Sequence, residues 1–155
     1  MATVPAARGM YFEEFEVGQK MISPGRTVTE ADVVGFAGLS GDFNLIHTDA
    51  EYSKNSPFGA RVAHGLLGLS IAYGLALRTG VLEGTVIAFR EIVGWKFVKP
   101  VFIGDTIHVE MEIIETKAMR RLGGGKVELE FDVINQNDET TMKGVWSVLV
   151  MSKPE

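Results

Sequence analysis

Residues 65–78 form the most apolar segment of the chain, and apolar side chains cover nearly every side of the helix that they predict. A helix that is hydrophobic all round must be buried over most of its surface. Gly65, Gly68 and Gly74 weaken this helix but let other backbones approach closely, and Gly80 suits a C-terminal cap. The apolar residues are Leu66, Leu67, Leu69, Ile71, Ala72, Tyr73, Leu75, Ala76 and Leu77. We therefore expect a buried central helix at about 65–78.

The second half of the chain follows β-strand patterns. Residues 126–133 alternate strictly between polar and apolar side chains, and residues 108–113 alternate in a similar way. This alternation is typical of strands with one buried face and one exposed face. Residues 84–98 contain a long extended segment, residues 141–151 predict the last strand, and the three glycines at 123–125 indicate a turn. Four long antiparallel strands are therefore expected.

The segment before the apolar helix is more polar and predicts short helices and loops. Thr29 can cap a helix, because it is followed three residues later by an aspartate and then by apolar residues. Ser40-Gly41 ends that helix, so residues 42–47 are expected in a loop. A short helical turn follows, capped by Thr48 or Asp49.

One buried helix followed by four long strands predicts an α+β fold, with the helix packed on one face of an antiparallel sheet. A sheet that wraps around a central helix would bury every side of residues 65–78. That architecture is the hot-dog fold. The length of 155 residues suits a single domain, which we expect to span 1–155 with a loose tail at 1–10.

Charge and composition exclude several classes of function. The net charge is −5, from 15 basic and 20 acidic residues, which argues against a nucleic-acid partner. The chain has no cysteine, so disulfides, thiolate chemistry and zinc-thiolate sites are excluded. The first ten residues lack the apolar core of a signal peptide, and no apolar stretch reaches membrane-spanning length. We expect a cytoplasmic protein without a membrane partner.

Three polar side chains lie close together in the stretch between the first predicted helix and the apolar one. Asp42 and His47 are five residues apart, with Asn44 between them. A carboxylate and an imidazole can share one water molecule and move its protons. Gly65 opens the apolar helix, where a backbone N–H can hold a developing oxyanion. Each residue alone has an ordinary structural explanation, such as a turn aspartate; their conjunction indicates a catalytic site.

The other polar candidates favour structural roles. His64 precedes Gly65 and is expected to form hydrogen bonds in the loop, although it is also a candidate for substrate binding. His108 occupies a polar position on a strand, so a solvated face is expected there. The histidines show no metal-ligand spacing, and we expect no metal site. Four basic residues could meet the phosphates of a nucleotide-like carrier or could be scattered surface charge: Lys96, Lys99, Arg120 and Arg121.

Two segments together resemble the signature of the MaoC-like dehydratases, which include the (R)-specific enoyl-CoA hydratases, also called hydratase 2. They are Ser40-Gly-Asp-Phe-Asn-Leu-Ile-His-Thr-Asp49 and Phe58-Gly-Ala-Arg-Val-Ala-His-Gly-Leu66. The resemblance implies that Asp42 and His47 form the catalytic dyad and that the Gly65 N–H faces the thioester oxygen. One departure is visible: the family usually has proline where this chain has Leu45.

The resemblance implies reversible hydration of trans-2-enoyl-CoA to (R)-3-hydroxyacyl-CoA, in fatty acid metabolism, with coenzyme A as the carrier and no metal or redox cofactor. Two alternatives stay open. A hot-dog acyl-CoA thioesterase usually carries a carboxylate on or near the central helix, and residues 66–77 contain none. The other alternative is a non-catalytic acyl-thioester-binding subunit that has lost its dyad.

The expected partners are an acyl-CoA substrate and further copies of the chain. A long strand at the edge of a sheet exposes unpaired backbone groups, and residues 126–133 and 85–89 are the candidates for such an edge. Hot-dog proteins commonly pair these edges, so the resemblance implies a homodimer or a higher homo-oligomer.

Overall fold

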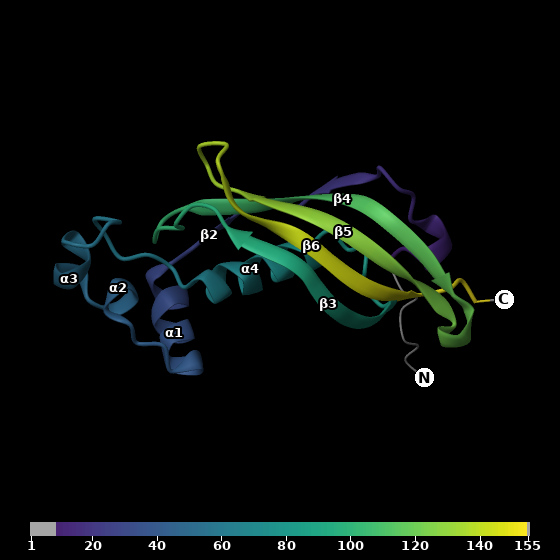
Figure 1. Cartoon of the computed structure of the whole chain (residues 1–155), viewed down its shortest axis with the longest axis horizontal. Helices are drawn as coiled ribbons and strands as arrows, with labels where there is room; N and C mark the ends of the chain where they lie inside the picture. Colours follow the sequence, from purple (N-terminus) through teal and green to yellow (C-terminus); the bar gives the residue numbers. More distant parts are fainter. Residues whose placement is uncertain (1–8, 155) are drawn as a thin grey trace, which may run out of the picture.

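A computed structural model describes residues 9–154 (Figure 1). Short 3-10 helices lie at Phe12–Glu14 and Arg120–Leu122. The helices are α1 (Glu30–Ser40), α2 (Leu45–Thr48), α3 (Ala50–Lys54) and α4 (Gly65–Leu77), and the strands are β1 (Lys20–Ile22), β2 (Arg26–Thr27), β3 (Val86–Phe97), β4 (Thr106–Met119), β5 (Gly124–Ile134) and β6 (Thr140–Met151). The antiparallel sheet has the order β1-β4-β5-β6-β3, and β2 pairs with β4.

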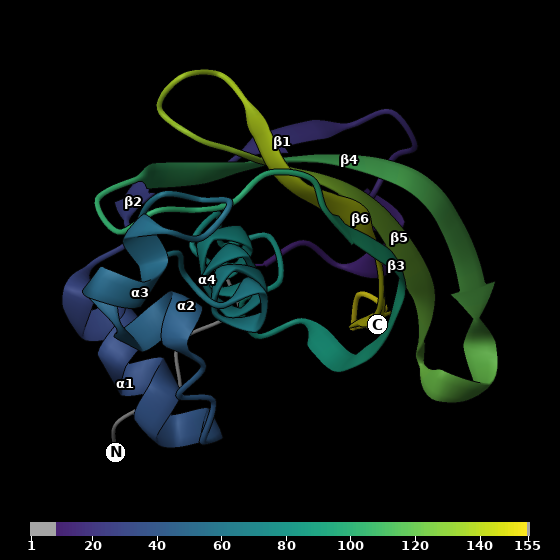
Figure 2. The same ribbon diagram turned by 60° about the vertical axis from the view of Figure 1, so that its left-hand side comes forward.

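The sheet curves around α4, which confirms the α+β class and the hot-dog architecture (Figure 2). The alternation in β5 places its apolar side chains on the concave face, where Leu129 and Phe131 are almost fully buried. They share one hydrophobic core with Leu67, Ile71 and Leu75 of α4. Burial of this apolar face supplies the main stabilisation of a helix that three glycines weaken.

The expectation that α4 is buried on most sides is wrong for the isolated chain. Leu66, Tyr73 and Leu77 are 61%, 40% and 37% exposed, because the sheet covers only one side of the helix. The helix ends at Leu77 with Arg78 as its C-cap, and Gly80 takes a left-handed conformation two residues later, with φ 82°. The uncovered side of α4 is therefore an apolar surface of the single chain.

Strand β3 is one edge of the sheet, and the expectation that residues 126–133 could form an edge is wrong. Those residues belong to β5, which lies between β4 and β6. Within the described range 9–154, strand β3 pairs on one side only, with β6. Its exposed apolar side chains are Val86, Ile87, Phe89, Ile92, Val93 and Phe97. Exposed backbone groups and exposed apolar side chains therefore coincide on β3.

Capping interactions define the helices before α4. Thr29 accepts a hydrogen bond from the Asp32 N–H, and the Asp32 side chain accepts one from the Thr29 N–H, so the predicted start of α1 is confirmed. Gly41 ends α1 in the left-handed conformation, with φ 79°. Asp49, rather than Thr48, caps α3.

The expected tail at 1–10 falls mainly outside the described residues. Within the described part, Gly9 and Met10 are held by backbone hydrogen bonds from their N–H groups to the carbonyls of Glu83 and Val81, each 2.8 Å long. Residues 9 and 10 are therefore anchored to the loop that precedes β3. Among residues 9–154, no helix combines the length and the apolar character that a membrane crossing needs.

Candidate functional site

Asp42 and Asn44 shape the turn between α1 and α2. One Asp42 carboxylate oxygen, Oδ1, accepts a hydrogen bond from the Asn44 N–H at 3.1 Å. The Asn44 side chain in turn accepts from the Ile46 N–H at 3.3 Å and caps α2. The Asp42 side chain is 51% exposed, so its second oxygen stays open to a ligand. Asn44 therefore stabilises the turn through two hydrogen bonds, one donated by its own N–H and one accepted by its side chain from the Ile46 N–H.

His47 lies on the single-turn helix α2, so its expected position in a loop is wrong. The ring is buried, and its Nδ1 is 2.7 Å from the carbonyl oxygen of Val62. Because a carbonyl can only accept, Nδ1 carries a proton, and Nε2 has a free lone pair whenever the ring is neutral. This Nε2 lies 3.9 Å from Asp42 Oδ2. The separation is too long for a direct hydrogen bond and leaves both atoms as acceptors.

Leu45 is the first residue of α2, a position that favours proline because its N–H has no partner within the helix. The preceding Asn44 has φ −54° and ψ 138°, which a following proline tolerates. We expect Leu45→Pro to raise the free energy of unfolding by about 0.4–1 kcal/mol, because proline restricts the unfolded chain. Urea unfolding measures this effect. A destabilised variant would contradict the placement of Leu45 at the first position of α2, where proline is tolerated.

His64 contacts both members of the Asp42–His47 pair. Its Nε2 donates to the Asp42 carbonyl oxygen at 2.9 Å, and its ring stacks on His47 with centroids 3.8 Å apart and planes 26° from parallel. The ring is buried, and its Nδ1 has no hydrogen-bond partner among residues 9–154. His64 was expected to form hydrogen bonds in the loop, and its hydrogen bond to the backbone carbonyl of Asp42 is such a contact.

Gly65 begins α4, so its N–H has no acceptor within the helix. The first intrahelical bond of this turn runs from the Gly68 N–H to the His64 carbonyl, at 3.1 Å. A Cβ added to Gly65 would lie 2.9 Å from the Phe97 ring. A side chain at this position would therefore have to displace the Phe97 ring, which is 54% exposed, independently of any role of the N–H in binding.

A cavity of about 430 Å³ lies beside these residues. Its wall comes from α2, from the start of α4 and from the end of β3 with the segment that follows. The lining residues are Ile46, His47, Phe58, Val62, Ala63, His64, Gly65, Gly68, Phe97, Val98, Lys99, Pro100, Val101 and Met142. An apolar cavity with a few convergent polar groups is the usual form of a small-molecule site.

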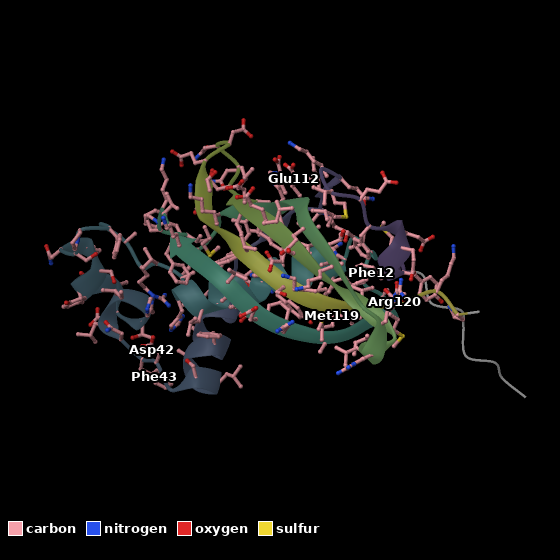
Figure 3. All side chains as sticks on the ribbon, turned by 45° about the vertical axis from the view of Figure 1, so that its right-hand side comes forward. Phe12, Asp42, Phe43, Glu112, Met119 and Arg120 are labelled. Carbon is pink, nitrogen blue, oxygen red and sulfur yellow. The ribbon has the colours of Figure 1, made fainter. Side chains whose placement is uncertain are left out.

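Of the four basic residues considered for phosphate binding, Lys99 lines this cavity. Its ammonium group binds Glu139 at 2.5 Å, and this hydrogen bond holds the pKa of the Glu139 carboxyl below its ordinary value. Arg120 lies at the other end of the molecule from Asp42 (Figure 3). Within one chain, Lys99 therefore remains a candidate for phosphate binding at this cavity, whereas Arg120 does not.

Asp42, His47 and His64 also place three potential metal-ligand atoms within 4.8 Å of one another. Sequence spacing did not indicate this group, because His64 is 17 residues from His47. The two ring planes are 26° from parallel, so in-plane lone pairs of the stacked rings do not converge at the distance of about 2.0–2.1 Å that zinc requires. The geometry favours hydrogen-bond chemistry.

Two contributors to the site were missed by sequence reasoning. The Val62 carbonyl fixes the His47 tautomer, and a backbone group leaves no signal in the sequence. Arg61 donates from Nε to the His47 carbonyl at 2.6 Å. A bulky cation between Ala60 and Val62, in a loop of mostly small residues, was the available signal for Arg61.

Comparison with known proteins places the chain in a family. Residues 13–135 match the family model described as MaoC like domain. The chain is 36% identical over 124 residues to a 3-hydroxybutyryl-CoA dehydratase of Methylorubrum extorquens, with 76% of this chain and 73% of the relative covered. It is 45% identical over 101 residues to Protein MaoC of Klebsiella aerogenes, covering 65% of this chain but only 30% of that longer protein.

A solved structure agrees with the sequence comparison. The unliganded (R)-hydratase from Pseudomonas aeruginosa superposes with a TM-score of 0.77 at 29% identity, covering 94% of this chain and 88% of that one. The family match spans the turn that carries Asp42 and His47, the start of α4 and most of the sheet. The chain belongs to the MaoC-like dehydratase family.

Proposed function

We propose that the protein hydrates trans-2-enoyl-CoA reversibly to (R)-3-hydroxyacyl-CoA. The observation that carries the proposal is the 3.9 Å separation of Asp42 Oδ2 and His47 Nε2, two acceptors of which His47 lines the apolar cavity. One water molecule can donate a proton to each of them. The family match and the dehydratase and hydratase names of similar proteins support the same reaction class.

In the hydration direction, the water oxygen attacks the β-carbon of the enoyl thioester. Asp42 or His47 takes a proton from the water, and a proton is delivered to the α-carbon, so the elements of water are added across the double bond. The dehydration runs through the same steps in reverse. The buried His47 is held by the Val62 carbonyl, while the exposed Asp42 is held through its turn.

The negative charge that develops on the thioester oxygen needs a hydrogen-bond donor. We assign this role to the Gly65 N–H, which lacks an intrahelical acceptor at the start of the thirteen-residue α4. The positive end of the helix dipole adds to the stabilisation. Coenzyme A is the proposed carrier, the reaction as written uses no metal or redox group, and a cytoplasmic location stays a prediction.

The thioesterase alternative is less well supported. A thioesterase directs water at the carbonyl carbon, and α4 carries no Asp or Glu for that purpose. The non-catalytic alternative requires a chain without its catalytic pair, whereas here His47 lines the cavity and Asp42 Oδ2 lies 3.9 Å from His47 Nε2.

A panel of enoyl-CoA substrates of increasing chain length tests the proposal. Hydration is followed by the loss of enoyl-thioester absorbance, and the product is then offered to dehydrogenases specific for (R)- or (S)-3-hydroxyacyl-CoA. We expect hydration with oxidation by the (R)-specific enzyme alone. Release of free thiol without hydration would identify a thioesterase, and saturable acyl-CoA binding without turnover would identify a binding subunit.

We also propose that two copies associate through β3 and the uncovered side of α4. Twelve residues of edge strand and the exposed Leu66 and Tyr73 form one surface that pairing would bury. We expect a dimer by analytical sedimentation at micromolar concentration. Val93→Arg, on β3, should weaken it more than tenfold, whereas Leu39→Arg on α1, although 84% exposed, should not. A monomeric wild-type protein would contradict this assembly.

A further inference from the structure

The segment from Arg61 to His64 contacts both members of the Asp42–His47 pair. The Val62 N–H donates to the Ile46 carbonyl at 3.1 Å, and the Val62 carbonyl accepts from His47 Nδ1 at 2.7 Å. This segment is itself held to the connection between β3 and β4, because the Ala63 N–H donates to the Val101 carbonyl at 2.8 Å. The position of α2 thus depends on bonds from a neighbouring segment.

Arg61 extends this contact to α1. Its Nε donates to the His47 carbonyl at 2.6 Å, and one terminal nitrogen lies 2.8 and 3.0 Å from the two carboxylate oxygens of Glu30. The Arg61 side chain is only 17% exposed, whereas that of Glu30 is 57% exposed. A single guanidinium group therefore connects the start of α1 to the end of α2.

We propose that Arg61 is a positioning residue for His47, an inference that rests on the proposed hydration reaction. Helix α2 has four residues, too few to be stable by itself. The bond to the His47 carbonyl keeps α2 against Val62, so that Nδ1 keeps its acceptor. Without this bond the ring moves away from Val62, and the tautomer with the proton on Nε2 becomes favoured, because Asp42 can then accept it.

This tautomer change would remove the function of His47 without removing the residue. A proton on Nε2 turns the free lone pair into a donor, and the ring no longer accepts a proton from water. Lysine cannot replace arginine fully, because its single ammonium nitrogen cannot reproduce the fork that reaches His47 and Glu30 together. A displacement of about 1 Å in a catalytic group can cost on the order of 10²-fold in rate.

The test uses Arg61→Met, which removes the guanidinium group, Arg61→Lys, which keeps the charge, and Arg26→Met as the matched control. Arg26 pairs with Asp32 on the same helix α1 but makes no contact with His47. For Arg61→Met we expect kcat for enoyl-CoA hydration to fall roughly 10- to 100-fold, with a smaller change in KM, because Arg61 itself does not line the cavity. Arg61→Lys should lose less, and Arg26→Met should keep its kcat.

A second measurement needs no substrate. Nitrogen-15 spectra of histidine-labelled protein, assigned with His47→Asn, report which ring nitrogen of His47 carries the proton. We expect Nδ1–H in the wild-type protein and in Arg26→Met, and a shift toward Nε2–H in Arg61→Met. If Arg61→Met does not fold, Arg61→Lys is read by the same criteria.

Unchanged kcat and an unchanged His47 tautomer in a folded Arg61 variant would overturn the positioning role. An equal loss of kcat in Arg26→Met would also overturn the positioning role, because the loss could then be explained by a less stable α1 alone. If the wild-type protein shows no hydration, the proposed function fails, while the tautomer shift still decides whether Arg61 positions His47.

Discussion

Asp42→Asn and His47→Asn should each lower the rate of enoyl-CoA hydration by about 10²–10⁴-fold, the usual contribution of a general acid–base group. Asparagine keeps the Oδ1 acceptor that Asp42 offers to the Asn44 N–H, but replaces the second oxygen with a donor. At position 47, an asparagine amide can still donate to the Val62 carbonyl, so the buried carbonyl keeps a partner. Steady-state kinetics measures both effects.

Two controls separate chemistry from folding. Asp49→Asn changes an aspartate that caps α3, where asparagine caps equally well, and His108→Asn changes a histidine on β4 beside Glu110. Both should keep wild-type rates. The double variant of Asp42 and His47 should lose little more than either single variant, because both groups act on one water. Near-full activity in either folded single variant would refute the proposed pair.

Gly65→Val should lower turnover by roughly 10²–10³-fold if the Gly65 N–H holds the thioester oxygen. The added side chain would stand where the substrate must approach that N–H. It would also collide with the Phe97 ring, which lies 2.9 Å from the position of a Cβ. We therefore expect a lower melting temperature as well, and the packing effect has to be measured separately from the effect on binding.

The double variant Gly65→Val with Phe97→Ala makes that separation. Removal of the ring relieves the collision, so the melting temperature should recover relative to Gly65→Val, whereas turnover should stay low relative to Phe97→Ala alone, which is the reference because Phe97 lines the cavity. Gly38→Ala on α1, outside the proposed interface, is the control, because a Cβ there meets no atom within 4 Å. It should keep its turnover and gain up to about 1 kcal/mol of stability. Recovery of turnover in the double variant would leave Gly65 with a packing role only.

Local patterns predicted the elements of this fold well. The alternation at 126–133 depends only on which side of one strand is buried, and β5 shows that alternation. The start of α1 at Thr29 depends on contacts within four residues, and both capping bonds are present. Where the physical cause lies within one element, the sequence was sufficient.

Relations between distant elements were not predictable in the same way. Whether residues 126–133 lie at an edge or in the interior depends on strand order, which a single strand does not encode. The helical turn at His47 is held by Val62 and Arg61, more than a dozen residues later. Likewise, His64 finds the backbone of Asp42 rather than its side chain. These contacts depend on how α1, α2 and the start of α4 come together.

The two edges of the sheet are unequal, and this limits the size of any assembly built on them. On one edge, β1 and β2, which are three and two residues long, pair only with residues 110–112 and 106–107 of β4, while the other edge is the twelve-residue β3. Open filaments need two different complementary edges on each subunit, so that every added copy leaves a new edge for the next. Pairing of β3 with β3 of a second copy uses the same edge on both subunits, so neither β3 remains for a third copy. In the proposed assembly, growth through β3 would therefore close at two copies related by a twofold axis.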